Sequence, residues 1–367
     1  MKKVLFVVHA LGYGGVGKML SYLANYVCDA GYDVVIYVQE QLGQHYSQNN
    51  KITIVQETRF FSNYYTRHFQ QIGQLRKRII EIKPDIVISF QTNQNALSVL
   101  ATRGKGIPVI ISERGDPYQY NSIIAKLKNI VINRAEGGVF QTQKAKEYFG
   151  KGLQKRSKVI YNPNTVPTMP IPKWENRRDE IVFVARFDIQ QKRQDLIVKA
   201  FSMICDKIPS FKLGFYGIGD DEKQIREQVH SLGIDEKVIF HGLERDIPNA
   251  IRNAKLFVLT SDYEGMPNAL IEAMAVGLPC ISTDCSPGGA AELINTGENG
   301  VIVPKGDVEA IKKAIMRMLS NPTEAEKMGI EAQKIVEKLD PEIIYKQWKE
   351  YINEVLNKKE KNRNSSM

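Results

Sequence analysis

Four charged side chains in the second half of the chain have the types and spacing of a site that binds a diphosphate and a sugar. Arg186 comes directly after an apolar run, Lys192 comes six residues later and before a helical pattern, and Glu264 and Glu272 lie on either side of a Gly-Met-Pro-Asn turn. Cations in such loops neutralise a diphosphate and the charge that develops on it as it leaves. Carboxylates accept hydrogen bonds from vicinal hydroxyls. We therefore expect Glu272 to bind a ribose and Glu264 to bind the hydroxyls of a second sugar.

The turn between the two glutamates predicts a helix N-terminus at which a nucleotide diphosphate or a polyol can dock. Proline suits the start of a helix, glycine permits close approach of backbone to ligand, and the first amides of a helix point away from it. The residues expected to contribute in this way are Gly265, Met266, Pro267, Asn268 and Ala269. Glu272 then carries a carboxylate into an apolar helical pattern, where an unpaired charge is costly, and a bound ribose would justify it.

Two carboxylates could also be the acid and base of a hydrolase. Against that alternative, Glu264 and Glu272 sit across a loop-to-helix junction, and no second acidic residue clearly faces a bond shared with either of them. Gly217 follows another apolar run, in a Gly-Ile-Gly-Asp turn, and we expect this close turn to lie at the same edge of the sheet, where a ligand binds.

A glycine-rich turn, residues 12–19 with the sequence GYGGVGKM, follows the first apolar run of the chain. With Glu40 it can be interpreted as a dinucleotide fingerprint, which would make the protein an NAD(P)-dependent oxidoreductase. It also resembles an ATPase phosphate loop, but Met19 stands where a hydroxyl must bind magnesium. A third interpretation is a turn whose amides at Gly14 and Gly15 face the diphosphate of a ligand held by another domain. A tight turn without any ligand is the structural alternative.

The elements that must position these residues alternate between strand and helix. Apolar, β-branched runs predict strands at 4–8, 34–38, 86–89, 109–112, 138–141, 180–185, 212–216, 238–241, 256–260, 280–283 and 300–303. Amphipathic patterns predict helices at 18–30, 69–82, 193–208, 222–232 and 341–357. This alternation is typical of parallel sheets covered by helices, and it predicts an α/β fold with two doubly wound, Rossmann-like domains.

The domain boundaries follow from breaks in that alternation. We expect an N-terminal Rossmann-like domain at 1–166, a proline-rich linker at 167–178 and a C-terminal Rossmann-like domain at 179–340. A final helix is expected at 341–357, after a break at Asp340-Pro341, and the charged tail at 358–367 is expected to be disordered.

Charge is divided unequally along the chain. Residues 1–165 contain 22 Lys+Arg and 10 Asp+Glu, a net charge of +12, whereas the remaining residues contain 28 and 31, a net charge of −3. The excess favours an anionic partner for the first half, either phosphorylated substrate, nucleic acid or anionic lipid, although a solvated basic surface would have the same composition. No stretch approaches the roughly 20 apolar residues of a membrane span, and the start of the chain is interpreted as a strand rather than a signal peptide. These observations predict a cytoplasmic protein, peripheral on the inner face of the cell membrane at most.

Together these residues resemble the GT-B glycosyltransferases, and within them the large retaining family 4, whose signature is Glu, seven residues, Glu. The resemblance covers essentially the whole chain and includes Gly14-Gly15, Asn162-Pro163, Arg186, Lys192, 217–219, Glu264 and Glu272. It implies an α/β, GT-B architecture in which two Rossmann-like domains face each other across a cleft. The acceptor domain would be 1–166, the donor domain 179–340, and the final helix at 341–357 would pack back on the first domain.

The resemblance also implies the roles of individual residues. Arg186 and Lys192 should contact the donor diphosphate, Glu272 the ribose, and Glu264 with the amides of 265–268 the transferred sugar. It further implies transfer with retention of anomeric configuration, without a metal and without a cofactor, since the nucleotide sugar is a substrate. The leaving phosphate itself would help to deprotonate the acceptor.

One segment departs from the family pattern. Many relatives carry a histidine in the loop after the fourth strand, where this chain has Ile-Ser-Glu-Arg-Gly-Asp at 111–116. Any role borrowed from that histidine does not carry over, and Glu113 and Arg114 are the residues placed to bind the acceptor.

The sequence therefore predicts a hexosyltransferase or N-acetylhexosaminyltransferase of bacterial capsule, exopolysaccharide or cell-surface glycan synthesis. Its donor would be a nucleotide diphosphate sugar, in the first instance a UDP-sugar, and its acceptor a saccharide or polyprenyl-linked glycan, with no nucleic acid as partner. The alternatives are an NAD(P)-dependent oxidoreductase and a basic module that binds nucleic acid or lipid. The latter lacks aromatic residues interleaved with basic ones.

Overall fold

The computed structural model describes residues 1–12, 15–42, 48–57, 67–119 and 121–364. The chain divides into two compact units: unit 1 comprises Met1–Pro163 and Pro341–Met367, and unit 2 comprises Asn164–Asp340. The chain thus enters unit 2 at Asn164, upstream of the segment 167–178 that was expected to be a linker.

Unit 1 contains, in its described residues, a seven-stranded sheet whose neighbouring strands are all parallel. Its strand order is β3-β2-β1-β4-β5-β6-β7. The strands are β1 (Lys3–Leu11), β2 (Asp33–Leu42), β3 (Thr53–Gln56), β4 (Ile86–Phe90), β5 (Val109–Glu113), β6 (Gly137–Phe140) and β7 (Ser157–Val159).

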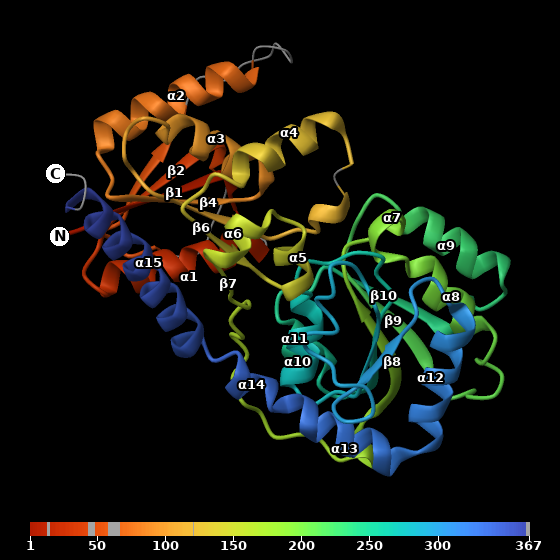
Figure 1. The fold of residues 1–367 in the computed structure, drawn as a ribbon. Helices are drawn as coiled ribbons and strands as arrows, with labels where there is room; N and C mark the ends of the chain where they lie inside the picture. Colours follow the sequence, from red (N-terminus) through yellow and green to blue (C-terminus); the bar gives the residue numbers. More distant parts are fainter. Residues whose placement is uncertain (13–14, 43–47, 58–66, 120, 365–367) are drawn as a thin grey trace. The chain divides into compact units, whose positions relative to one another are not determined.

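The helices of unit 1 cover both faces of this sheet. They are α1 (Gly15–Asp29), α2 (Arg67–Ile82), α3 (Thr92–Thr102), α4 (Ile123–Ile132), α5 (Gln143–Glu147), α6 (Lys151–Lys155) and α15 (Pro341–Asn364). Helices α2, α3 and α4 lie on one face, whereas α1 and α15 lie on the other (Figure 1). Because both faces are covered, the central strands are buried and read as continuous apolar runs rather than as alternating ones.

Unit 2 is built in the same way around a six-stranded parallel sheet in the order β10-β9-β8-β11-β12-β13. The strands are β8 (Arg178–Val184), β9 (Lys212–Tyr216), β10 (Val238–Gly242), β11 (Ala254–Leu259), β12 (Cys280–Thr283) and β13 (Val301–Val303). The helices are α7 (Ile189–Lys192), α8 (Gln194–Ser202), α9 (Glu222–Ser231), α10 (Ile247–Ile251), α11 (Asn268–Ala275), α12 (Val308–Ser320), α13 (Pro322–Gln333) and α14 (Ile335–Lys338). Helices α8, α9 and α12 lie on one face, and α10 and α11 on the other (Figure 1).

The strand order of each sheet reverses once, between β1 and β4 in unit 1 and between β8 and β11 in unit 2. In doubly wound sheets, ligands bind at the carboxyl ends of the strands at such a reversal, because the crossover helices diverge there and leave a crevice. The segments after β8 and β11, and those after β1, β4 and β5, are therefore where a site is expected.

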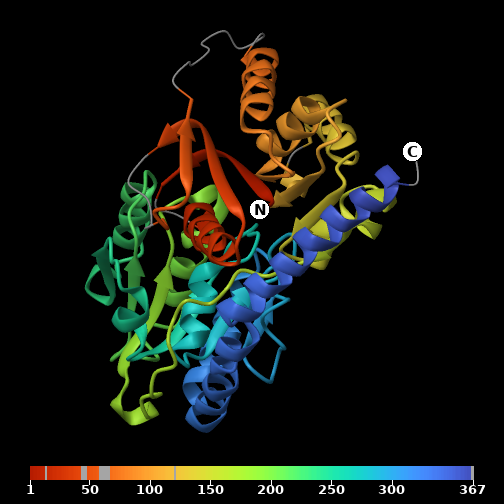
Figure 2. The same cartoon turned by 90° about the vertical axis from the view of Figure 1, so that its left-hand side faces the viewer.

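Helix α15 carries the chain back to unit 1, where it lies beside α1 (Figure 2). Its Trp348 is fully buried, with its ring centroid 6.2 Å from that of Phe90. The hydroxyl of Tyr351 accepts a 2.9 Å hydrogen bond from the amide of Gly138. A Cβ on Gly137 would stand 2.2 Å from the same hydroxyl, so the glycine gives α15 room to dock on β6.

Two helices differ in length from the sequence-based expectation. The helix predicted at 193–208 is shorter than expected: Arg193 adopts φ 54° and caps its start, and α8 runs only from Gln194 to Ser202. Helix α15 runs from Pro341 to Asn364 and so extends beyond residue 357, where the predicted helix ended; no Gly or Pro interrupts it there. In the part of the chain that the structure describes, no helix is long and apolar enough to cross a membrane.

Candidate functional site

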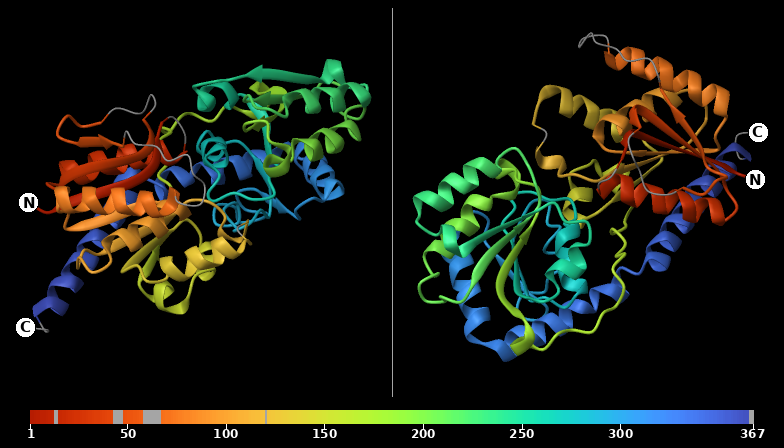
Figure 3. Two further views of the ribbon diagram at one scale, coloured as in Figure 1. Left: turned by 90° about the horizontal axis from the view of Figure 1, so that it is seen from above. Right: turned by 180° about the vertical axis from the view of Figure 1, so that it is seen from behind.

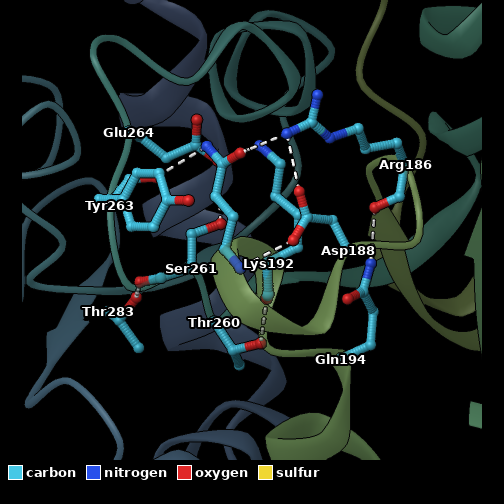
Figure 4. A network of polar contacts seen from close by, with 10 residues as sticks. Arg186, Asp188, Lys192, Gln194, Thr260, Ser261, Tyr263, Glu264 and Thr283 are labelled. Carbon is cyan, nitrogen blue, oxygen red and sulfur yellow. Dashed lines mark hydrogen bonds and ion pairs between the residues drawn. The ribbon is translucent and has the colours of Figure 1, made fainter. Parts of the chain in front are cut away.

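The centre of the candidate site in unit 2 is an ion pair between Lys192 and Glu264. The Lys192 ammonium donates to Glu264 Oε1, and the hydroxyl of Ser261 donates to the same oxygen at 2.9 Å (Figure 4). Both charged side chains are largely buried, at 15% and 11% exposure. Lys192 ends the short helix that follows β8, and Glu264 lies in the loop that follows β11. The pair therefore stands at the point where the strand order of this sheet reverses.

The backbone around Lys192 is held in place from both ends of helix α7. Asp188 caps the helix, because its carboxylate accepts from the amide of Gln191 at 3.0 Å. At the other end Arg193 is in the left-handed region, where a residue with a side chain costs about 1 kcal/mol or more. Thr260 compensates by donating to the carbonyls of Lys192 and Arg193, at 3.1 and 2.7 Å. This arrangement fixes the direction in which the Lys192 side chain leaves the backbone.

Arg193 is tied to the same loop through its side chain. Its guanidinium lies 3.0 Å from Asp195 and 3.1 Å from Asp262, and these carboxylates raise its pKa above the usual range. Because its guanidinium is paired with two protein carboxylates, we infer that Arg193 holds the loop of Asp262 in place rather than binding a ligand.

Arg186 is the exposed cation of the site. Its side chain is 62% exposed, and its Nη2 donates to Asp188 and to the side-chain oxygen of Gln191, each at 2.7 Å. Gln191 in turn donates to the carbonyl of Tyr263 at 3.0 Å, so the residue next to Glu264 is linked to Arg186. The structure thus brings Arg186, Lys192 and Glu264 into one polar network.

Gly217 lies against the start of that network. Its φ is 139°, and a Cβ built on it would stand 2.1 Å from the carbonyl oxygen of Ala185. Gly219 is in equally close contact with the backbone of Phe187, at 2.3 Å from its carbonyl oxygen. The Gly-x-Gly turn after β9 therefore packs directly on the residues that flank Arg186, and no other residue type fits there.

The donor-binding segment predicted at 265–269 leads into α11 as expected. Pro267 stands at the N-cap position, and its carbonyl accepts from the amides of Leu270 and Ile271 at 3.1 and 3.2 Å. Met266 and Pro267 are buried, whereas Gly265, Asn268 and Ala269 are half-buried. Glu272 is half-buried one turn into α11. Glu264, Gly265 and the N-terminus of α11 are thus contiguous at the edge of the sheet.

Sequence reasoning missed several residues that shape this site. The hydroxyl of Ser261 is the second donor to the Glu264 carboxylate, after Lys192. The loop after β12 contacts the backbone of Glu264 and Gly265. The carbonyl of Ser286 accepts from the Glu264 amide at 2.7 Å, and a Cβ on Gly289 would stand 2.1 Å from the Gly265 carbonyl oxygen. The run Ser-Pro-Gly-Gly at 286–289, two residues beyond the strand predicted at 280–283, was a turn signal that could have identified this loop.

The two acceptor-site candidates lie in unit 1, at and after the end of β5. Glu113 is buried, and its carboxylate accepts from the Thr92 hydroxyl at 2.8 Å and from the amides of Arg114 and Gly115 at 3.2 and 3.3 Å. Burial raises the pKa of Glu113 above its usual value, although these three donors oppose the shift.

Arg114 points into the aromatic interior of unit 1. Its guanidinium carbon is 5.8 Å from the ring centroid of Phe90 and 5.7 Å from that of Trp348, and Nη1 donates to Asn162 at 3.3 Å. Its Nε and Nη2 are buried without a hydrogen-bond partner among the described residues. This burial lowers the pKa of Arg114 to about 10. The guanidinium therefore anchors α15 to the sheet through cation–π contacts.

Glu113 and Arg114 both border a cavity of about 460 Å³ at the carboxyl edge of the unit 1 sheet. The lining comes from the ends of β1, β4 and β5 and from helices α1, α3 and α4; polar members include His9, Gln91, Thr92, Asn93, Gln94, Ser122 and Lys128. The predicted donor contact Gly14 lies outside the described residues, and Gly15 is the first residue of α1. No group of three or more potential metal ligands occurs among residues 1–12, 15–42, 48–57, 67–119 and 121–364.

Comparison with known proteins matches both units to glycosyltransferase families. The model described as glycosyltransferase family 4 matches residues 13–164, and the model described as glycosyl transferases group 1 matches residues 168–335.

Two curated relatives align with almost the whole chain. An uncharacterised glycosyltransferase of Haemophilus influenzae is 26% identical over 357 residues, which are 95% of this chain and 99% of the relative. A Campylobacter jejuni protein, 26% identical over 364 residues, spans 97% of this chain and 100% of its own length. That protein is named as an α-1,4-N-acetyl-D-galactosaminyltransferase acting on an undecaprenol diphosphate-linked saccharide.

Solved structures show the same fold. The apo form of the lipopolysaccharide outer core galactosyltransferase WaaB superposes with a TM-score of 0.79 at 19% identity, over 96% of this chain and 99% of that one. Anabaena HepE in complex with UDP gives a TM-score of 0.77 at 17% identity, over 96% and 100%. With two parallel, doubly wound sheets and family matches that cover both units, the chain is a glycosyltransferase of family 4 with the GT-B fold.

Proposed function

We propose that the protein is a retaining, metal-independent transferase that moves a hexose or N-acetylhexosamine from a UDP-sugar to a lipid-linked or polysaccharide acceptor of the bacterial cell surface. The observation that carries the proposal is the buried Lys192–Glu264 pair, which stands beside Arg186 at the strand-order reversal of unit 2. A cation pair and a carboxylate at one sheet edge suit a substrate that has a diphosphate at one end and hydroxyls at the other.

Arg186 and Lys192 would bind the donor diphosphate. When the bond between the anomeric carbon and the phosphate oxygen breaks, its electron pair leaves with the nucleoside diphosphate and adds negative charge there. Cations already fixed in place stabilise that charge more in the transition state than in the ground state. Lys192 is fixed by its partly buried ion pair, and Arg186 by Asp188 and Gln191.

Glu264 would orient the transferred sugar rather than attack it. Lys192 and Ser261 both donate to Oε1, and none of the described residues donates to Oε2, so Oε2 is available to accept from a sugar hydroxyl. A carboxylate that is already paired with an ammonium is a weak nucleophile. The proposed reaction is therefore same-face attack, in which the acceptor oxygen bonds to the anomeric carbon and its proton passes to the leaving phosphate oxygen.

Glu272 and the start of α11 would complete the donor site. A carboxylate can accept both vicinal ribose hydroxyls, and the N-terminus of a helix favours anionic and hydroxyl groups. The backbones of Gly265 and Gly289 approach each other closely, so the loop after β11 and the loop after β12 would lie side by side against the nucleotide sugar.

The cavity in unit 1 would take the acceptor. It has Glu113 and Thr92 at its edge, as well as amide side chains that can hydrogen-bond hydroxyls. The name of the Campylobacter jejuni relative includes an undecaprenol diphosphate-linked acceptor, and this supports a polyprenyl-linked glycan here. Neither the oxidoreductase nor the nucleic-acid alternative gains support from the relatives.

The donor is tested by thermal shift with UDP, GDP, ADP and NAD at equal concentrations. UDP alone should raise the melting temperature, because a ligand at 100 times its Kd stabilises the native state by about 2.7 kcal/mol. If GDP or ADP alone stabilises the protein, the donor is assigned to that nucleotide instead of UDP. Stabilisation by NAD alone would overturn the proposal as a whole.

Transfer itself is tested with labelled UDP-sugars and a bacterial membrane extract, with and without EDTA. An extractable lipid-linked product that forms equally in both, and whose new linkage has the anomeric configuration of the donor by NMR, is the expected result. Activity that disappears with EDTA and returns with Mg²⁺ would disprove metal independence, and an inverted linkage would disprove retention.

A further inference from the structure

Helix α4 of unit 1 presents an apolar face to solvent. In this ten-residue helix, Ile123, Ile124, Leu127 and Ile130 are 77%, 49%, 57% and 58% exposed, whereas Ile132 is fully buried. Soluble proteins expose single apolar residues everywhere, but four large ones within two turns form a contiguous patch that marks an interaction surface. The helix packs beside α3 on one face of the sheet (Figure 3).

Two lysines border this patch. With about 100° between successive residues, the four exposed apolar residues fall on one side of α4, and Lys126 and Lys128 fall on the two flanks of that side. Lys126 is exposed, and Lys128 donates to the Asn93 side chain at the neighbouring end of α3. An apolar face between flanking lysines is the pattern of a helix that lies in a membrane interface, since lysine stems cover apolar surface while their ammonium groups reach the headgroups.

The charge around α4 is complementary to an anionic surface. Residues 117–135 contain Lys126, Lys128 and Arg134 and no Asp or Glu. The N-terminal half of the chain, to which they belong, has a net charge of +12. Anionic lipid attracts such clusters, whereas a protein partner that covered only the apolar face would gain nothing from the excess of cations.

The apolar face also adjoins the cavity proposed for the acceptor. Ile124, Ala125 and Lys128 of α4 line that cavity together with Glu113 and Arg114. A helix lying in the interface would therefore place the cavity mouth beside the headgroups, where the head of a lipid-linked saccharide could enter.

We propose that α4 is a membrane-docking helix. Its face of Ile123, Ile124, Leu127 and Ile130 inserts at the headgroup boundary of an anionic bilayer, and Lys126 and Lys128 bind the lipid phosphates. The entry of an acceptor from the bilayer rests on the proposed function; the binding of lipid does not.

The test is flotation of the full chain with vesicles of phosphatidylcholine, with and without 30% phosphatidylglycerol, at low and at high salt. The wild type should float only with anionic vesicles and lose binding at high salt. Leu127→Glu and Ile130→Glu should each reduce the partition coefficient about tenfold or more, which is the scale of burying one large apolar side chain. Lys126→Gln should weaken binding at low salt only.

The matched control is Ile330→Glu in α13 of unit 2, where the native side chain is 53% exposed on a helix as well. It should float like the wild type. Equal flotation of the wild type and Leu127→Glu would overturn the proposal. So would a wild type that does not float with anionic vesicles. A concentration-dependent dimer that Leu127→Glu abolishes, without vesicle binding, would instead assign the face to a second copy.

Measuring UDP binding separately distinguishes a failure of the membrane-docking proposal from a failure of the proposed function. UDP binding should be the same for Leu127→Glu and the wild type, because α4 belongs to unit 1, whereas Arg186, Lys192, Glu264 and Glu272 belong to unit 2. Loss of lipid binding with intact UDP binding supports the docking helix, whereas failure of the wild type to bind UDP would count against the donor assignment alone.

Discussion

Lys192 and Glu264 lie 72 positions apart in the chain and form a largely buried ion pair at the edge where β8 and β11 adjoin. Removing one partner leaves the other partly buried and unpaired, which costs more than the pair contributes to stability. The pair therefore couples the stability of unit 2 to the geometry of its candidate site.

We expect Lys192→Met to reduce kcat/KM for transfer by about 10² to 10³-fold, on the scale of removing a fixed group that stabilises developing charge. It should also lower the free energy of unfolding by roughly 2–4 kcal/mol, because Glu264 then keeps only Ser261. Initial rates and urea denaturation measure the two effects.

Comparing Lys192→Met with Glu264→Leu and with the double variant separates structure from chemistry. If the pair acts as one unit, the double variant should be more stable than the sum of the single effects predicts and no more active than either single variant. Additive effects on the rate would contradict a shared role in catalysis.

Arg186→Ala should impair donor binding without harming the fold. The side chain is 62% exposed, and surface ion pairs of this kind contribute little to stability, so the free energy of unfolding should change by less than about 0.5 kcal/mol. The KM for the donor should rise about tenfold, as expected for the loss of one charge-assisted contact.

The control for Arg186→Ala is Arg317→Ala on α12, whose side chain is 54% exposed and also pairs with a carboxylate, that of Glu324. Both variants should unfold like the wild type, and only Arg186→Ala should alter the KM. An unchanged KM in Arg186→Ala would remove this residue from the diphosphate site.

The strands and helices of both units were predictable because apolar, β-branched runs alternate with amphipathic patterns. The prediction of an α/β, GT-B fold is confirmed. The edge strands β3 (Thr53–Gln56) and β7 (Ser157–Val159) escaped notice, since they are short and mix polar with apolar residues. The left-handed conformation of Arg193 could not be predicted either, because no glycine marks it and tertiary contacts such as those of Thr260 impose it.

The candidate site was predictable only where one local segment carries it. Glu264 and the turn that follows could be recognised as a unit, and Arg186 and Lys192 as loop cations. Ser261 and the 286–289 loop could not, since their contacts with Glu264 and Gly265 depend on β11 and β12 being neighbours in the sheet. The catalytic and binding roles of these residues stay predictions.

Gly289→Ala should disturb the site more than the fold. Its Cβ would stand 2.1 Å from the Gly265 carbonyl oxygen and 3.1 Å from Pro267 Cδ, so the loop that carries Glu264 must shift. A displacement of about 1 Å can cost roughly 10²-fold in rate. Gly73→Ala in α2 is the control, since its Cβ meets nothing within 4 Å and alanine favours a helix. Steady-state rates that are equal in Gly289→Ala and the wild type would show that this contact does not position the donor loop.

Glu113→Gln should change how stability depends on pH. Burial raises the pKa of Glu113, so the folded chain holds this proton more tightly than the unfolded chain does. The wild type therefore loses stability as pH rises from the unfolded value, about 4.3, through the folded pKa, whereas glutamine does not titrate and can still accept from the amides of Arg114 and Gly115. We expect the variant to gain stability over the wild type between pH 4 and pH 8, measured by urea denaturation. The exposed Glu147→Gln should show no such trend. An advantage for wild-type Glu113 that grows with pH would mean that its three donors outweigh its burial.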